Sequence, residues 1–463
     1  MIYRFFIALL IINYKNMNIH FIAIGGSAMH NLAISLRLKG YHITGSDDEI
    51  FEPAAGRLKK YGIFPDSIGW DSKRVTKDID AVILGMHARM DNPELLKAKE
   101  LGLKIYSYPE FIYEQSKNKK RIVIGGSHGK TTITSMILHV LDAYHIPCDY
   151  MIGAQLEGFE VMTKLSEEAP TIIIEGDEYL TSSLDKRPKF HVYQPNIGVI
   201  SGIAWDHVNV FPTFEIYVEQ FQIFADMIPD AGTLIYCIED EYCVKVAANT
   251  RTKHKIGYSI PDYRVENGKY IIRSDKNEYT LQVFGRHNLL NMNAARNVCA
   301  CLGVNDNDFY TAIQSFKGAS KRLEKVYEDT EKALYKDFAH SPSKLKATIR
   351  AMKEKYPERP LVACVELHTF SSLTGEFLKQ YAHAMDDADE AVVYFNPHAI
   401  ALKKLPPITE EIVLNAFANP KLLVFSDSLI LNTYLKSLLW KNKNLLMMSS
   451  GNFDGMQFET IFQ

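Results

Sequence analysis

The chain has 463 residues, too many for one ordinary domain, so we expect about two to four domains. Its 52 Lys and Arg against 55 Asp and Glu give a net charge of −3, which excludes a general affinity for nucleic acid or for anionic membranes. The six cysteines are scattered and form no Cys-x-x-Cys pair, which excludes the usual zinc and disulfide frameworks and favours a cytoplasmic protein.

The first sixteen residues imitate the start of a signal peptide without completing it. Arg4 precedes an apolar run at 5–12, but no small-residue cleavage site follows, and the run is too short to span a bilayer. We therefore expect residues 1–16 to be a non-native or disordered extension, with Met17 as the natural start. A short membrane anchor is the alternative, and stable membrane insertion is not expected.

The first unit, expected at 17–117, begins as a nucleotide-binding α/β fold does. An apolar strand at 19–24 ends in a pair of glycines, a helical pattern follows, and a second strand at 41–44 ends close to Asp47. This pattern indicates a nucleotide-like ligand at the carboxyl edge of a parallel sheet.

The glycine fingerprint of dinucleotide-binding folds is incomplete in this unit. Counted from Gly25, the other glycines of Gly-x-Gly-x-x-Gly would stand where Ala23 and Ala28 are found. The turn therefore does not identify NAD, and a dinucleotide oxidoreductase is kept only as an alternative class.

A charged linker at 117–120 leads into a second unit, expected at 118–325, which opens with the most informative motif of the chain. A strand at 121–124 is followed by Gly-Ser-His-Gly-Lys-Thr-Thr at 126–132, and then by a helix with apolar residues on one face. Backbone N–H groups and the helix N-terminus of such a turn face phosphate, its lysine adds positive charge, and its threonine hydroxyl reaches Mg²⁺. The motif predicts ATP binding, although Ile124 stands where a standard P-loop has its first glycine.

Two other interpretations of this motif stay open. Gly-Lys-Thr can occur by chance in a surface loop, and a genuine P-loop can serve a nucleotide-dependent switch or binding protein. Release of phosphate from ATP separates an enzyme from a switch.

Polar residues follow two apolar runs of the second unit. The run at 171–174 ends at Glu175, and the run at 197–203 leads to Asp206 and His207. A carboxylate at the end of a strand beside a P-loop is where a Mg²⁺ ligand belongs. The alternatives are a solvated loop acid for Glu175 and a structural histidine for His207.

The third unit, expected at 326–463, alternates strands and helices. Strands are expected at 333–338, 361–365, 391–395, 422–425 and 445–448, with helices such as 343–355 and 428–440 between them. The alternation predicts a doubly wound α/β fold. The expected fold class is thus α/β with three domains: a Rossmann-like N-terminal domain, a central P-loop ATPase-like domain and a Rossmann-like C-terminal domain.

Six motifs in the same order make the chain resemble the Mur ligases, three-domain enzymes that use ATP to join amino acids or peptides to UDP-N-acetylmuramic acid. The match extends from Met17 to the C-terminus. The motifs are the loop at 126–132, Glu175, Asp206-His207, Gly-x-His-Asn-x-x-Asn-x-x-Ala-Ala at 285–295, Phe316-Lys317-Gly318 with Arg322, and Asp-Phe-Ala-His-Ser-Pro at 337–342.

The resemblance implies a mechanism and a set of site residues. The γ-phosphoryl group of ATP activates the lactyl carboxylate of UDP-N-acetylmuramate as an acyl phosphate, which the incoming amine attacks. The implied ATP-binding residues are Gly126, Ser127, His128, Gly129, Lys130, Thr131, Thr132, Asn288, Asn291, Arg322 and Asp337. The implied catalytic residues are Lys130, Glu175, His207, Arg322 and His340, and the implied Mg²⁺ ligands are Thr131, Glu175 and His207.

The resemblance also implies that the first unit binds the UDP-sugar. The residues implied are Gly25, Gly26, Ser27, Met29, Ser46, Asp47 and His87. Several relatives carry a carbamylated lysine about fifteen residues after the Mg²⁺ histidine. Gln222 occupies that region here, so a second metal bridged by a carbamate is not expected.

Within the family, the chain is similar to the branch that contains the alanine-adding and murein-tripeptide ligases, because His128 lies inside the ATP loop. The turn Asp-Lys-Arg-Pro-Lys-Phe at 185–190 favours L-Ala-γ-D-Glu-meso-diaminopimelate, the murein tripeptide, as the second substrate. The residues expected to bind this peptide are Lys186, Arg187, His368 and Phe453, since lysine and arginine suit its carboxylates.

The alternative second substrate is L-alanine. The segment Glu-Leu-His-Thr-Phe-Ser at 366–371 is more similar to the alanine-adding ligases. Addition of diaminopimelate alone is disfavoured, because the third unit lacks the corresponding Asp-Asn-Pro-Arg motif. The expected partners are small molecules, and the sequence does not give the oligomeric state.

Overall fold

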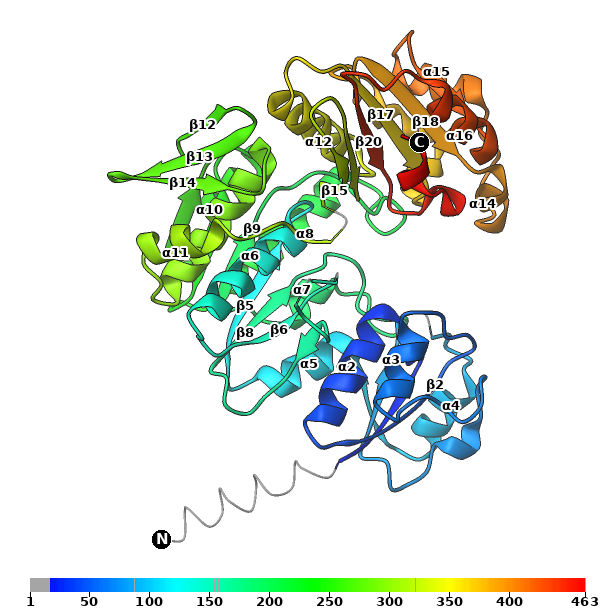
Figure 1. Cartoon of the computed structure of the whole chain (residues 1–463). Coiled ribbons are helices and arrows are strands. Elements are labelled where there is room, and N and C mark those ends of the chain that lie inside the picture. Colours follow the sequence, from blue (N-terminus) through cyan, green and yellow to red (C-terminus); the bar gives the residue numbers. More distant parts are fainter. Residues whose placement is uncertain (1–16, 87, 154, 157, 321, 463) are drawn as a thin grey trace.

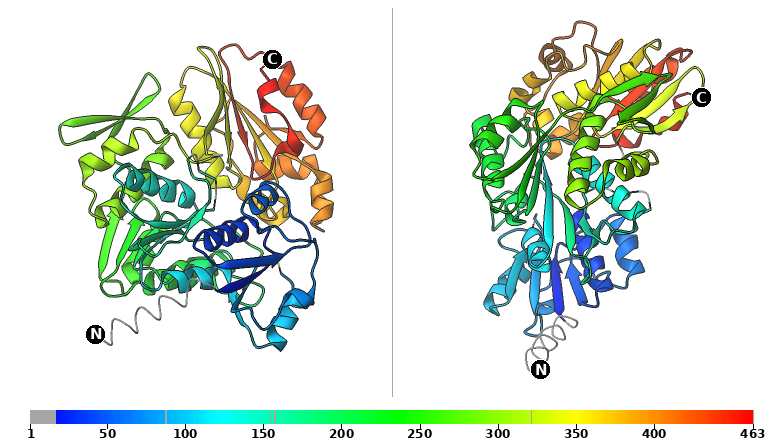
Figure 2. Two further views of the ribbon diagram at one scale, coloured as in Figure 1. Left: turned by 60° about the horizontal axis from the view of Figure 1, so that its bottom comes forward. Right: turned by 90° about the vertical axis from the view of Figure 1, so that its left-hand side faces the viewer.

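The computed structural model of the chain describes residues 17–462 except 87, 154, 157 and 321. The expectations for residues 1–16 and for His87 lie outside the described residues. The chain forms three lobes, with the first unit at the bottom of Figure 1, the central unit in the middle and the third unit at the top. The right-hand view in Figure 2 shows the same succession from the side.

The first unit is built on a four-stranded parallel sheet in the order β2-β1-β3-β4. Its strands are β1 (Asn18–Ile22), β2 (His42–Ser46), β3 (Ala81–Leu84) and β4 (Lys104–Ser107), and its helices are α2 (Ser27–Leu38), α3 (Ala54–Lys60), α4 (Pro93–Glu100) and α5 (Tyr108–Ser116). All four residues of β3, Ala-Val-Ile-Leu, are buried, as expected of a parallel strand covered on both faces.

The central unit holds a seven-stranded sheet in the order β11-β10-β9-β5-β8-β6-β7, in which only the β6–β7 pair is antiparallel. Its strands are β5 (Lys120–Gly125), β6 (Asp149–Met151), β7 (Thr163–Lys164), β8 (Thr171–Glu175), β9 (Ile197–Ile200), β10 (Thr233–Cys237) and β11 (His254–Tyr258). Its first helices are α6 (Lys130–Ala143), α7 (Lys189–Val192), α8 (Phe214–Asp226) and α9 (Glu241–Asn249). The strand β5, which carries the P-loop, lies between β8 and β9, the two strands followed by the expected polar residues.

A small antiparallel sheet and two helices complete the central unit. The strands are β12 (Tyr263–Glu266), β13 (Lys269–Ser274) and β14 (Asn277–Leu281), followed by α10 (Arg286–Cys301) and α11 (Asp306–Ile313). Helix α10 packs against α6, the helix that follows the P-loop (Figure 1). This packing brings the segment 285–295 to the phosphate loop.

The third unit has a six-stranded sheet in the order β15-β16-β20-β17-β18-β19. Its strands are β15 (Glu324–Glu328), β16 (Ala333–Asp337), β17 (Leu361–Leu367), β18 (Glu390–Phe395), β19 (Leu423–Phe425) and β20 (Asn444–Met448). Its helices are α12 (Pro342–Lys355), α13 (Gly375–Leu378), α14 (Pro397–Leu402), α15 (Glu410–Phe417) and α16 (Ser428–Ser437). Only β15 runs antiparallel to its neighbour, so the expected doubly wound fold is confirmed.

A buried arginine holds the junction between the first two units. Arg121, on β5, donates hydrogen bonds to five backbone carbonyls: Ser116, Lys117 and Lys119 on one side, and Tyr193 and Gln194 on the other. Because the first of these carbonyls lie at the end of α5, the guanidinium both caps that helix and fixes the linker to the central sheet.

The expected fold class is confirmed, and the domain boundaries remain predictions. Strand β15 begins at Glu324, within two residues of the predicted boundary at 325/326. Among the residues that the structure describes, no helix combines the length and the apolar character needed to cross a membrane.

Candidate functional site

A pocket of about 410 Å³ lies where the P-loop faces the third unit. The central unit lines it with Ser127, His128, Gly129, Lys130, Thr131, Thr132, Glu175, Glu178, Asp206, His207, His287, Asn288, Asn291 and Arg322. The third unit lines it with Asp337, Phe338, Ala339, His340, Ser343, Lys344, Ala347, Thr348, Thr369 and Ser450. All residues predicted for ATP and catalysis line this pocket, except Gly126, which lies at the start of its loop.

The phosphate loop turns sharply between β5 and α6. Gly126 has φ +126° and Gly129 has φ +76°, backbone conformations that a residue with a side chain rarely adopts. Lys130, the first residue of α6, folds its ammonium back to donate to the carbonyl of Gly126 at 2.8 Å. The helix N-terminus and the lysine thus face one concave turn, which is an anion site.

Thr131 and Glu175 lie together as a Mg²⁺ site would require. The hydroxyl of Thr131 donates to Glu175 Oε1 at 2.6 Å, and the backbone N–H of Gly153 donates to Glu175 Oε2 at 2.7 Å. A hydroxyl oxygen and a carboxylate beside a phosphate loop are the hard oxygen ligands that Mg²⁺ prefers. These two residues fit the ion and would supply its protein ligands.

The structure groups His207 with other carboxylates than the one expected. Ligand atoms of Asp177, Glu178 and His207 lie within 4.8 Å of one another. Glu178 Oε1 is 3.8 Å from His207 Nε2, and Glu178 is only 1% exposed. Glu178 belongs to the acidic segment Glu-Gly-Asp-Glu at 175–178, which begins at the last residue of β8. In the sequence, this segment could have indicated Glu178 as a candidate ligand as well as Glu175.

Two contacts connect the P-loop side of the pocket with α12 of the third unit. Ser343 Oγ lies 2.9 Å from His128 Nε2, and Lys344 Nζ lies 3.9 Å from a carboxylate oxygen of Asp206. Burial raises the pKa of Asp206, but Lys344 and His207 more than offset this, so its pKa is lowered overall. One hydrogen bond and one ion pair therefore connect the central unit with the third unit at this pocket.

Two of the four histidines that line the pocket, His128 and His340, are held uncharged. Burial, together with the nearby Lys344, lowers the pKa of both His128 and His340 to about 3. His340 Nδ1 donates to the carbonyl of Phe338 at 2.7 Å, which leaves Nε2 free to accept a hydrogen bond. At neutral pH, neither ring can add positive charge to a phosphate.

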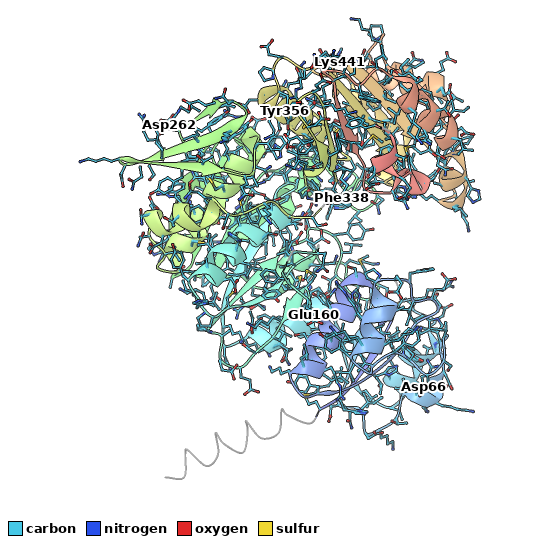
Figure 3. All side chains as sticks on the ribbon, in the orientation of Figure 1. Asp66, Glu160, Asp262, Phe338, Tyr356 and Lys441 are labelled. Carbon is cyan, nitrogen blue, oxygen red and sulfur yellow. The ribbon has the colours of Figure 1, made fainter. Side chains whose placement is uncertain are left out.

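Arg322, Asp337 and Asn291, three more of the predicted ATP residues, also line the pocket. Asp337 accepts hydrogen bonds from the N–H groups of Leu323 and Ala339, and Arg322 lies with its guanidinium 4.5 Å from the ring centroid of Phe338. Phe338, labelled in Figure 3, marks the junction of the central and third units. Asn291 is 9% exposed.

A second pocket, of about 470 Å³, lies at the N-terminus of α2 in the first unit. Of the residues predicted for the UDP-sugar, it is lined by Gly25, Gly26, Ser27 and Asp47. No sequence motif singles out Arg57, yet it lines the same pocket and donates a hydrogen bond to Gln155 of the central unit. A helix N-terminus and an arginine together suit a diphosphate.

Two residues predicted for the UDP-sugar need correction. Met29 is 5% exposed and packs in the hydrophobic core, because it lies on the inner face of α2. Ser46 is fully buried, and its hydroxyl donates to the buried Glu94. Neither side chain lines the pocket.

Replacement of Asp47 by asparagine should stabilise the protein at alkaline pH. Burial raises the pKa of Asp47 from 3.8 to about 6, so its native-state stabilisation is present at low pH and lost as the pH rises through about 6. Asparagine keeps an acceptor for the Gly25 N–H, which Asp47 holds at 2.7 Å. We expect about 1–2 kcal/mol more stability at pH 8 and about half that gain at pH 5, measured by urea denaturation. An equal change at both pH values would contradict this account.

Comparisons with known proteins identify the family of the chain. A model described as the Mur ligase family, catalytic domain, matches residues 18–120, and one described as the Mur ligase middle domain matches 124–299. The UDP-N-acetylmuramate–L-alanine ligase of Clostridium kluyveri is 31% identical over 398 residues, which covers 82% of this chain and 83% of that protein.

The chain belongs to the Mur ligase family. It is an ATP-dependent ligase that forms amide bonds. Two solved structures share its fold: a murein peptide ligase from Psychrobacter arcticus, with a TM-score of 0.66 at 23% identity, and a UDP-N-acetylmuramate–alanine ligase from Thermotoga maritima, with a TM-score of 0.70 at 21% identity. Each comparison covers 95% of this chain and 97% of the other.

The residues predicted to bind the peptide are not gathered in one place in this Mur ligase. Lys186 and Arg187 are exposed on a turn outside the nucleotide pocket, and Arg187 pairs with Asp185. His368 lies 3.6 Å from Glu366, next to Thr369 of the pocket. The prediction for Phe453 needs correction: its side chain is 1% exposed in the core of the third unit, and only its backbone N–H is used, by Glu366.

Several residues of the pocket were not predicted. The unpredicted residues that carry polar groups are Glu178, Asp206, His287, Ser343, Lys344, Thr348, Thr369 and Ser450. For Asp206, the sequence predicts membership of the Asp206-His207 motif but no role in the site. Lys344 stands two residues after the Asp-Phe-Ala-His-Ser-Pro motif, and a cation so close to a motif predicted to reach ATP was the available signal.

Proposed function

We propose that this Mur ligase joins L-Ala-γ-D-Glu-meso-diaminopimelate to the lactyl carboxylate of UDP-N-acetylmuramate and releases ADP and phosphate. Thr131 and Glu175 would hold Mg²⁺, which neutralises charge on the polyphosphate. Lys130 and Arg322 would stabilise the transferring phosphoryl group, and the pocket of the first unit would hold the UDP-sugar. The expected location is the cytoplasm.

An exposed carboxylate close in sequence to a residue of the nucleotide pocket carries the choice of the tripeptide. Asp454 follows β20, four residues after Ser450 of the pocket, and accepts hydrogen bonds from Tyr394 and Asn396, the latter at 2.9 Å. Both of these donors are neutral groups. The tripeptide keeps a second ammonium group, on diaminopimelate, after its alanine amine has reacted. L-Alanine has no second ammonium, so an anionic site suits only the peptide.

The turn at 181–188 supports the same choice. Thr181 N–H donates to the carbonyl of Arg187, and Ser183 Oγ donates to the carbonyl of Ala88 in the first unit. These bonds hold Lys186 and Arg187 on a defined turn next to the first unit. Lys186 would offer the carboxylates of a peptide a cationic partner there, and Arg187 would do so by exchanging its pairing with Asp185.

L-Alanine is the second candidate. The relatives that resemble the chain over most of its length, such as the one from Clostridium kluyveri, are named for addition of L-alanine. The segment at 366–371 favours it too. The anionic site at Asp454 decides for the tripeptide in our proposal.

The test offers both amines to the enzyme with UDP-N-acetylmuramate and Mg²⁺-ATP. We expect kcat/KM for the tripeptide to exceed that for L-alanine by at least about tenfold, with ADP release only when an amine is present. Asp454→Asn should raise KM for the tripeptide and leave KM for ATP unchanged. A preference for L-alanine would replace the tripeptide in this proposal.

A further inference from the structure

A closed ring of hydrogen bonds joins two P-loop residues through two residues outside the loop. The hydroxyl of Tyr217, on α8, accepts from Ser127 Oγ at 2.8 Å and donates to Glu178 Oε1 at 3.0 Å. The other oxygen of Glu178 accepts from Lys130 Nζ at 2.5 Å. Ser127 and Lys130 belong to the same loop, and the backbone between them completes the ring.

The ring is shielded from water. Tyr217 is fully buried, Glu178 is 1% exposed, and the side chain of Lys130 is 15% exposed. Burial opposes the charge of Lys130, but Glu178 and Asp177 raise its pKa. A buried ammonium and a buried carboxylate each depend on the other, since either one left unpaired would be costly.

We propose that Glu178 is the resident counter-ion of Lys130, that ATP binding replaces it by a phosphate oxygen, and that Tyr217 holds the released carboxylate in place. The inference rests on the P-loop as the ATP site of the proposed function. Glu178 is thus a positioning residue that acts through Lys130. Part of the binding energy of ATP is used to break the Lys130–Glu178 pair.

The geometry favours this role over a resident cation site. Glu178 shares the cluster with Asp177 and His207, which could hold a metal ion. However, Lys130 is 2.5 Å from Glu178, and Lys189 is 2.6 Å from Asp177, so each carboxylate already has a lysine partner. A divalent cation would have to displace a positive charge from both.

The first test is the affinity of Glu178→Gln for a fluorescent methylanthraniloyl-ATP in the presence of Mg²⁺. Glutamine keeps the shape and removes the competing charge, so we expect the dissociation constant to fall by about tenfold. In a Lys130→Ala background the same substitution should have no effect. An unchanged constant, or tightening that persists without Lys130, would overturn the proposal. Weaker binding with loss of one bound Mn²⁺ by electron paramagnetic resonance would replace it with a cation site.

Tyr217→Phe tests the role of the tyrosine in the ring, and it should change nucleotide affinity in the direction opposite to that expected for Glu178→Gln. Without its hydroxyl donor the released carboxylate is less stable, so nucleotide affinity should fall by about threefold. Tyr279→Phe is the matched control: Tyr279 donates to Asn307 at 3.1 Å within the central unit, outside the pocket, and its loss should not alter nucleotide affinity. Tighter or unchanged binding by Tyr217→Phe would overturn this half. Wild-type protein that failed to bind the nucleotide would overturn the ATP site itself.

Discussion

Lys130→Ala will lower the rate of ligation by about a thousandfold or more and leave the fold intact. The lysine is the one ammonium that the P-loop itself places over its phosphate cradle, 2.8 Å from the carbonyl of Gly126. Its charge is needed most when the γ-phosphoryl group is transferred, since negative charge then spreads over the phosphate oxygens. The measurement is ADP release that depends on UDP-N-acetylmuramate and the acceptor amine.

A lysine outside the pocket provides the control for this variant. Lys353, on α12, pairs with Asp389 at 2.6 Å on the surface, and Lys353→Ala should retain full activity. Circular dichroism and the melting temperature should show that Lys130→Ala is folded. Substantial residual ligation by a folded Lys130→Ala protein would contradict the assignment of the P-loop.

Arg121→Ala will lower the melting temperature of the central unit by about 10 °C. The guanidinium is buried and serves five backbone carbonyls, three of them in the connection from α5 to β5. Removing it leaves several carbonyls without a partner and loses charged hydrogen bonds worth about 1.5–3 kcal/mol each before compensation. We expect a net loss of about 3–5 kcal/mol, measured by thermal denaturation followed by circular dichroism.

A surface arginine gives the matched comparison. Arg89 makes an ion pair with Asp91 at 2.9 Å, with both side chains mostly exposed, so Arg89→Ala should change stability by less than about 0.5 kcal/mol. Arg121→Lys should lie between wild type and Arg121→Ala, because one ammonium cannot serve both sides of the junction. Equal stability of Arg121→Ala and Arg89→Ala would disprove the role of the junction.

The parallel sheets could be predicted from the sequence because their strands are continuous apolar runs. Strand β8 carries Thr-Ile-Ile-Ile before its glutamate, and β3 is wholly apolar. Such runs, interrupted by glycine turns, leave few alternatives to a buried strand of a parallel sheet. Strand β15 could not be found in this way, since Glu-Lys-Val-Tyr-Glu at a sheet edge is mostly polar and has no apolar periodicity.

The parts of the site that follow directly from the P-loop and the strand ends were predictable, and contacts between distant elements were not. Thr131 and Glu175 follow β5 and β8, neighbours in one sheet, so their meeting follows from topology. Tyr217 reaches Glu178 only because α8 packs over the sheet edge, which no local pattern encodes. The prediction for Phe453 was wrong because its burial depends on packing within the third unit, which the sequence alone does not reveal.

The contact of Ser343 with His128 has a consequence for the timing of turnover. Helix α12 of the third unit contacts the P-loop side of the pocket through one hydrogen bond to His128 and one ion pair at 3.9 Å to Asp206, each worth about 1 kcal/mol or less. Ligands enter a pocket walled by both units only when those units separate, so every catalytic cycle includes an opening and a closing. These two contacts cost only a few multiples of thermal energy to break, so they add little to the hydrogen bonds that Tyr263 and Tyr270 of the central unit donate to Glu354 of α12. The nucleotide, once bound between the units, would add the contacts that keep the pocket shut.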